Sequence, residues 1–220
     1  MPATSLSTEE RARRVRLIVF DVDGVLTDGS IWIFPAPAAS HSTAEHAAQM
    51  EGKGGYAISS ANMIEAKGFN AHDGTGVSLA RLGGMKCAII TKRVSEAVAL
   101  RARDLRLEYV YQGQAFKMHA VREITTKEGI GLDAICYVGD DIIDLPVMRV
   151  CGFAVAVASA RDQVKAVAHY ITPNPGGHGA ARDAVEFILA AKGILDETIE
   201  RYVEERNPLP AGLEAGEGRP

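Results

Sequence analysis

Short, unbroken runs of apolar residues recur along the chain, and three of them end at polar side chains. Four runs are rich in β-branched or aromatic residues, over 17–20, 87–90, 135–138 and 153–157. Runs of this length and composition are typical of strands. Because every position is apolar, rather than every second one, the runs predict parallel strands that are covered on both faces.

Segments with helical signals separate these strands. Helices are predicted from Ser95 to Leu105, over 116–127 before Gly129, from Asp144 and Pro146 to Val150, and over 181–191 before Gly193. Serine and aspartate favour the N-cap, proline the first turn and glycine the C-terminal end of a helix. Strands that alternate with helices predict an α/β fold with a doubly wound, mainly parallel sheet and helices on both faces.

Two segments do not fit this alternation. Residues 30–34 and 63–69 can pair as a small β-hairpin, separated by a stretch over 35–62 that is either an insertion with a short helix or a lid. We expect an N-terminal extension over 1–16, one domain over 17–193 with the hairpin insertion at about 30–69, and a helix end with a flexible tail over 194–220.

Composition and charge restrict the class of protein. The 220 residues are 47% hydrophobic and 24% charged, which is ordinary for a globular domain, and the net charge of -4 gives no basis for nucleic-acid binding. The three cysteines show no metal-binding spacing and suggest a reducing compartment. Neither a secretory signal nor a membrane-length apolar run is found, so we expect a soluble, cytoplasmic protein.

The clearest candidate chemistry follows the first predicted strand. Asp21 and Asp23 are two residues apart at its carboxyl end, where their side chains can reach one cavity. Two carboxylates there repel each other unless they share a cation or one of them holds a proton, and Mg²⁺ prefers such oxygen ligands. Because parallel strands end at the same edge of a sheet, Thr91 and Asp140 are expected to converge with Asp21.

Each of these residues alone also has an ordinary structural explanation. The Asp21 motif can be a solvated turn, and Thr91 can be a residue in the segment that leads into a helix. Lys117 can be a solvated charge on a helix, Asp140 and Asp141 can be acidic loop residues, and Asp144 can cap a helix. Their order along one chain is more specific than any of them taken singly.

That order resembles the haloacid dehalogenase superfamily of aspartate-nucleophile phosphatases, over residues 17–189. Further motifs resemble the 3-deoxy-D-manno-octulosonate 8-phosphate phosphatase family. They are residues 21–29, Phe69-Asn70 with Asp73-Gly74, residues 111–113, residues 137–141 with 144–148, and residues 176–180. The resemblance implies a haloacid dehalogenase-like, Rossmann-type fold without a large cap domain.

The resemblance also implies roles for single residues. Asp21 is the nucleophile, Asp23 is the general acid and base, and Thr91 and Lys117 bind phosphoryl oxygens. Mg²⁺ is held by Asp21, the backbone carbonyl of Asp23, and Asp140. Asp141 and Asp144 orient these metal ligands or cap a helix rather than bind the metal. Candidate substrate-binding residues are Gly24, Arg93, Gly177 and Arg182, with Gly177 in a segment that can offer backbone N–H groups to an anion.

The resemblance further implies a homo-oligomer, specifically a tetramer, in which the apolar hairpin contributes to an interface; a hairpin buried in the core is the alternative. Two positions depart from the family pattern. Lys92 replaces a glycine after Thr91, and His72 replaces an arginine before Asp73. Both substitutions change charge and bulk at positions tied to the sugar.

We therefore expect Mg²⁺-dependent hydrolysis of a small-molecule sugar phosphate, 3-deoxy-D-manno-octulosonate 8-phosphate, in lipopolysaccharide precursor synthesis. A phosphatase for a nine-carbon, sialic-acid-type 9-phosphate is the nearest alternative. A phospho-receiver domain shares an acceptor Asp, acidic ligands, Thr and Lys, but has no group like Asp23. A non-catalytic scaffold is a third possibility, which retention of all five central residues disfavours.

Overall fold

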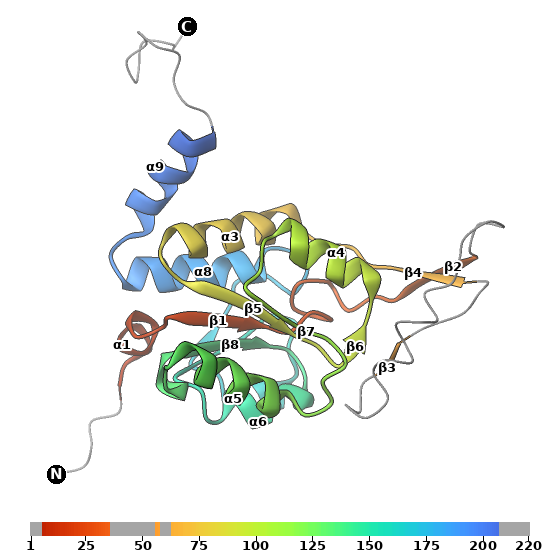
Figure 1. The fold of residues 1–220 in the computed structure, drawn as a ribbon. Coiled ribbons are helices and arrows are strands. Elements are labelled where there is room, and N and C mark those ends of the chain that lie inside the picture. The colour runs from red at the N-terminus through yellow and green to blue at the C-terminus, as the bar shows by residue number, and fades with distance from the viewer. Residues whose placement is uncertain (1–5, 36–55, 58–62, 207–220) are drawn as a thin grey trace, which may run out of the picture.

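A six-stranded parallel sheet forms the centre of the protein in a computed structural model that describes residues 6–35, 56–57 and 63–206 (Figure 1). The strand order is β10-β9-β8-β1-β5-β7, and each neighbouring pair runs parallel. The strands are β1 (Leu17–Phe20), β5 (Lys86–Ile90), β7 (Tyr109–Tyr111), β8 (Ile135–Gly139), β9 (Phe153–Ala156) and β10 (Tyr170–Ile171). The predicted parallel sheet is confirmed, and all four predicted runs are strands.

Helices cover both faces of this sheet, as the unbroken apolar runs predict. Every residue of β1, β8 and β9 is buried. Helices α3 (Ala71–Leu82) and α8 (Ala180–Ala191) pack against each other on one face, and α5 (Lys117–Glu128) and α6 (Leu145–Met148) lie on the other (Figure 1). Burial of apolar side chains between the layers is the main stabilising contribution.

The position of β1 in the sheet creates the crevice in which a site can form. From β1 the chain passes to β5 on one side and later returns to β8 on the other side. Helices that leave neighbouring strands in opposite directions open a crevice at the carboxyl ends of those strands. Asp21, Thr91 and Asp140 follow these ends.

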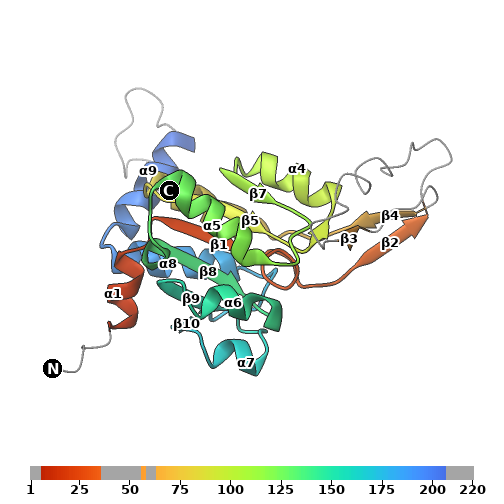
Figure 2. The same cartoon turned by 60° about the horizontal axis from the view of Figure 1, so that its bottom comes forward.

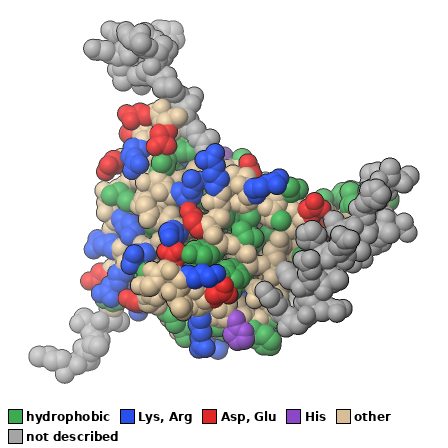
Figure 3. All heavy atoms as spheres, viewed as in Figure 1, with side chains coloured by type: hydrophobic (Ala, Val, Ile, Leu, Met, Phe, Trp, Pro, Cys, Tyr) green, Lys and Arg blue, Asp and Glu red, His purple; other side chains and the backbone are tan. Residues whose placement is uncertain are grey.

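The predicted hairpin exists and extends away from the sheet in both views (Figures 1 and 2). Strand β2 (Trp32–Pro35) pairs antiparallel with β4 (Met63–Ala66), with Trp32 opposite Ala66. All four residues of β2 are exposed, and hydrophobic side chains are visible at the surface there, at the right of Figure 3. The alternative of a hairpin buried in the core is therefore wrong for the single chain.

A second, shorter pairing connects the hairpin region to the segment after Thr91. Strand β3 (Tyr56–Ala57) pairs parallel with β6 (Arg93–Val94). The rest of the predicted 35–62 stretch, apart from its first residue, and the tail from residue 207 lie outside the described residues.

The predicted helices are confirmed, with some differences at their ends. Helix α4 (Glu96–Asp104) has Ser95 at its N-cap, but the serine side chain makes no capping hydrogen bond there. Gly129 ends α5 with a left-handed φ of 61°, a conformation that suits glycine. Helix α6 has Asp144 at its N-cap position and a proline in its first turn, as predicted, but the Asp144 side chain makes no capping hydrogen bond to this helix. That side chain instead forms a capping box with Asp141 on the preceding 3-10 turn over Ile142–Asp144.

Several elements lack a prediction. They are α1 (Thr8–Arg13), α3, α7 (Asp162–Lys165), the 3-10 turn Leu132–Ala134, and strands β7 and β10. Where a helix end and a flexible tail were expected from residue 194, a separate helix, α9 (Leu195–Arg206), is formed. Helix α3 is the most instructive, because Gly74 and Gly76 lower its helix propensity. A Cβ on Gly76 would lie 2.7 Å from the Cα of Arg182, so close packing of α3 on α8 requires glycine there.

No helix within the described ranges combines the length and the apolar character that crossing a membrane requires.

Candidate active site

The carboxyl ends of β1, β5 and β8 bring the predicted site residues into one cavity of about 570 Å³. Hydrogen bonds of the sheet continue past β1, because the Asp21 N–H donates to the Val138 carbonyl at 3.0 Å. The cavity lining includes all five predicted catalytic and metal residues: Asp21, Asp23, Thr91, Lys117 and Asp140. The convergence expected from the strand order is therefore present.

Lys117 is a buried charge at the start of α5, not a solvated one. Its Nζ lies 2.6 Å from Oδ2 of Asp21 and 2.7 Å from Oδ1 of Asp144. Burial alone would lower the pKa of Lys117, but the two carboxylates outweigh burial and raise it. Lys117 therefore stays cationic beside Asp21.

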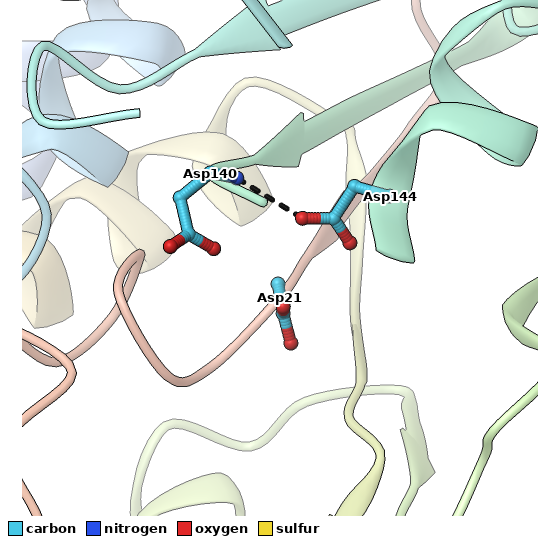
Figure 4. A group of neighbouring side chains, drawn as sticks. All are labelled: Asp21, Asp140 and Asp144. Atoms are coloured by element: carbon cyan, nitrogen blue, oxygen red, sulfur yellow. Dashed lines mark hydrogen bonds between the residues drawn. The ribbon is translucent and has the colours of Figure 1, made fainter. Parts of the chain in front are cut away.

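Asp144 is fully buried, and hydrogen bonds occupy both of its oxygens. Its Oδ1 accepts from Lys117 Nζ and from the Tyr137 hydroxyl, each at 2.7 Å. Its Oδ2 accepts from the backbone N–H groups of Asp140, at 3.0 Å, and of Asp141, at 3.2 Å (Figure 4). This arrangement fits a residue that orients Lys117 and the Asp140 loop, since neither oxygen is left free for a metal.

Asp21 and Asp140 have the properties expected of a cation site. Ligand oxygens of Asp21, Asp140 and Asp144 all lie within 4.8 Å of one another (Figure 4). Oδ1 of Asp140 is buried and finds no hydrogen-bond partner among the described residues. Burial, opposed by Lys117, raises the pKa of Asp21 to about 7, and burial together with Asp21 raises the pKa of Asp140 to about 8. A hard divalent cation would satisfy this oxygen and favour the charged forms.

Asp23 lies at the mouth of the cavity between two basic side chains. Its Oδ1 accepts a hydrogen bond from Lys67, and its Oδ2 lies 3.4 Å from Nε of Arg93. Gly24 follows in a left-handed conformation, with φ of 85°, and a Cβ at this position would collide with the Asp140 carboxylate. Only glycine fits this close approach without strain.

Comparisons with known proteins agree with this geometry. A family model described as haloacid dehalogenase-like hydrolase matches residues 87–182. The chain is 36% identical to 3-deoxy-D-manno-octulosonate 8-phosphate phosphatase KdsC of Escherichia coli K12 over 187 aligned residues. The alignment covers 85% of this chain and 86% of that protein. The chain belongs to this phosphatase family.

Solved structures of the family share the fold of this phosphatase. The enzyme of Moraxella catarrhalis, in complex with a magnesium ion, a phosphate ion and a KDO molecule, superposes with a TM-score of 0.73. It is 33% identical, covering 89% of this chain and 97% of its own. The enzyme of Yersinia pestis has a TM-score of 0.71 and 33% identity, covering 86% and 88%.

The glycine-rich segment does not offer the free donors that the sequence suggested. Backbone N–H groups of Gly176, Gly177 and Gly179 donate to the Ser159 hydroxyl, the Val25 carbonyl and the Asp73 carboxylate. The segment instead packs against the loop that follows Asp21, where a Cβ on Gly177 would collide with the backbone of Asp28. The expectation that Gly177 binds an anion through its N–H is therefore wrong in this conformation.

Arg182 also lies outside the cavity of its own chain. Its Nε donates to Glu186 at 2.6 Å, and its backbone N–H donates to Asp73. Of the two departures from the family pattern, Lys92 lines the cavity and His72 is exposed on α3. Among the candidate substrate-binding residues, Gly24 and Arg93 remain at the site.

Lys67 is not among the residues predicted for the site. Its side chain is buried and contacts Asp23 across 44 positions in sequence. The only local signal is a charged residue within the predicted hairpin strand over 63–69, which is too common to identify a site.

Proposed function

We propose that this chain is a Mg²⁺-dependent phosphatase that hydrolyses 3-deoxy-D-manno-octulosonate 8-phosphate to the free sugar acid and phosphate. The observation that carries the proposal is the buried group of Asp21, Lys117 and Asp140 at the switch point of the sheet. The names of the relatives, 36% identical over most of the chain, support the substrate.

Asp21 is the nucleophile in the proposed reaction. A carboxylate oxygen of Asp21 attacks phosphorus in line, and the bond between phosphorus and the sugar oxygen breaks. Water then hydrolyses the aspartyl phosphate, which releases phosphate and restores the carboxylate. Lys117 and Thr91 bind phosphoryl oxygens, and Lys117 acts in a buried site where electrostatic stabilisation is strong.

Asp23 moves the protons of both steps. It protonates the departing sugar oxygen, and in the second step it accepts a proton from the attacking water. Its position at the cavity mouth, with a quarter of its side chain exposed, supports access to both groups. Asp21, Asp140 and the backbone carbonyl of Asp23 would hold Mg²⁺, which when bound offsets the repulsion between the carboxylate nucleophile and the phosphoryl group.

Arg93 is the proposed partner of the sugar-acid carboxylate, because it lines the cavity and a guanidinium can bind a carboxylate through two hydrogen bonds. Lys92 adds a further positive charge to the same lining. This rim is where an eight-carbon and a nine-carbon sugar acid would be distinguished.

The protein is further proposed to work as a homo-oligomer, specifically a tetramer, in the cytoplasm. The exposed apolar side chains of the hairpin support self-association, since monomers rarely expose so many large apolar side chains together. They are Ile31, Trp32, Ile33, Phe34, Met63 and Ile64, each at least 36% exposed. The three free, buried cysteines support a reducing compartment.

A phosphate-release assay over sugar phosphates tests the proposed function. We expect the 8-phosphate of the eight-carbon acid to give the highest kcat/KM with Mg²⁺, and EDTA to abolish release. Preference for a nine-carbon 9-phosphate would overturn the substrate assignment alone. Stable phosphorylation of Asp21 without release would instead identify a phospho-receiver, and inactivity with every substrate would favour a scaffold.

A further inference from the structure

Lys67 directly follows β4 of the hairpin, yet its charge lies at the mouth of the active site. None of its side chain is exposed, and its Nζ donates a hydrogen bond to Oδ1 of Asp23. The hairpin therefore supplies a buried cation to the carboxylate that the proposed mechanism uses as acid and base.

A balanced group of four charges surrounds this contact. Glu65, with a side chain only 7% exposed, places Oε1 3.0 Å from Nζ of Lys67. On the other side of Asp23, Arg93 faces Oδ2. Two acids and two bases offset one another, which limits the cost of removing these charges from water. Glu65 thus pairs with Lys67 by charge, although its Oε1 accepts no hydrogen bond within the described residues, and Lys67 donates its hydrogen bond to Asp23.

The two oxygens of Asp23 are held differently. Lys67 contacts Oδ1 by a hydrogen bond, whereas Nε of Arg93 forms an ion pair with Oδ2 at the longer distance of 3.4 Å. Lys67 occupies Oδ1 and so leaves Oδ2 as the oxygen better placed to carry a proton. A lysine ammonium group donates hydrogen bonds but accepts none, so Lys67 cannot receive a proton and pass it on in place of Asp23.

We infer that Lys67 is a positioning residue for proton transfer, an inference that rests on the proposed function. Lys67 fixes Asp23 through Oδ1 so that Oδ2 donates and accepts the proton in the two steps. As the bond between phosphorus and the leaving oxygen breaks, the proton passes from Oδ2 to that oxygen. In the second step Oδ2 takes a proton from the attacking water. Misplacement of a reacting group by about 1 Å can cost about 10²-fold in rate.

Leaving groups of different basicity distinguish this role from a general structural one. A sugar alkoxide needs a proton as it departs, whereas p-nitrophenolate needs little help from an acid. For Lys67→Met we expect kcat/KM on the sugar phosphate, which reports the steps up to phosphoryl transfer, to fall by about 10²-fold. With p-nitrophenyl phosphate we expect kcat/KM to fall by less than about threefold, because hydrolysis of the shared aspartyl phosphate does not enter this ratio.

Two further variants complete the design. Lys86→Met is the matched control, because Lys86 is exposed and pairs with Glu128 away from the cavity. This variant is expected to hydrolyse both substrates as the wild type does. The double variant Lys67→Met with Glu65→Gln removes one charge of each sign, so the remaining Asp23 and Arg93 still balance. It is expected to fold and to show the same leaving-group selectivity.

Three kinetic outcomes would overturn the inference: an equal loss of kcat/KM with both substrates, a rise in KM alone, or an unchanged kcat/KM on the sugar phosphate. Crystal structures of the wild type and Lys67→Met, with magnesium and inorganic phosphate, test it independently of the substrate. The inference predicts that the Asp23 carboxylate leaves its position only in the variant. A wild type that turns over neither substrate would refute the proposed function, while the position of Asp23 would still decide the role of Lys67.

Discussion

At the scale of single residues, Gly24 shows how closely the loop after Asp21 approaches Asp140. In Gly24→Ala, the new Cβ collides with the Asp140 carboxylate and the left-handed φ adds strain. We expect the Mg²⁺ concentration needed for half-maximal activity to rise by about 10–100-fold, as when the support of a metal ligand is lost. Titration of activity with Mg²⁺ measures this.

Gly84→Ala is the matched control for strain. Gly84 also has a positive φ, of 77°, but among the described residues no atom lies within 4 Å of an added Cβ. It is expected to lose stability without a change in Mg²⁺ activation. Equal Mg²⁺ dependence of the two variants would contradict the account of Gly24.

The raised pKa values of Asp21, about 7, and Asp140, about 8, predict how pH affects the metal-free protein. An unfolded Asp has a pKa near about 3.9, so between about pH 4 and 8 the folded state binds more protons than the unfolded state. These groups therefore make the free energy of unfolding fall as pH rises through that window. Bound Mg²⁺ offsets the loss, more strongly at pH 8 than at pH 6, because protons compete with the metal.

Urea unfolding in EDTA at pH 5 and pH 8 measures this effect. Asp140→Asn removes one of the two titrating groups. The free energy of unfolding of this variant should therefore fall less from pH 5 to pH 8 than that of the wild type. A fall of the same size in both proteins would show that Asp140 is not the source.

At the scale of elements, Asp73 connects two helices that sequence reasoning did not connect. From the first turn of α3, its carboxylate accepts hydrogen bonds from the backbone N–H groups of Gly179, at 3.3 Å, and Arg182, at 3.1 Å, at the start of α8. We expect Asp73→Ala to lower the free energy of unfolding by about 1–2 kcal/mol, as for a lost helix cap.

Chemical denaturation checks this value against Asp104→Ala. Asp104 forms an exposed ion pair with Arg101, so its loss should cost no more than about 1 kcal/mol. If the two variants were equally stable, Asp73 would not connect the helices in the way described.

The elements also show what can be predicted from the sequence and what cannot. The strands β1, β5, β8 and β9 were predictable because complete burial requires apolar residues at every position. Helix α3 was not, because Gly74 and Gly76 meet the needs of tertiary packing at the expense of local propensity. The function of the Asp144 carboxylate depends on Lys117 and Tyr137, whose positions only the folded sheet determines.

At the scale of the whole molecule, the exposed hairpin predicts self-association. Trp32 is 56% exposed, and its ring stacks on Phe34, with centroids 6.5 Å apart. If the hairpin forms the interface, Ile33→Asp places a charge within it. The mass measured for this variant by light scattering should then fall below that of the tetramer. Val203→Asp, at a similarly exposed position on α9, should leave the mass unchanged. A wild-type protein that is monomeric at micromolar concentration would contradict the proposed assembly.

The central claim is that the Asp21 carboxylate accepts the phosphoryl group, and trapping that ester tests it most directly. The protein is mixed with the sugar phosphate and Mg²⁺, quenched in acid during turnover, digested and analysed by mass spectrometry. The account predicts a phosphorylated peptide that contains Asp21, and neither adduct nor phosphate release from Asp21→Asn. Phosphate release by Asp21→Asn at the wild-type rate would contradict it.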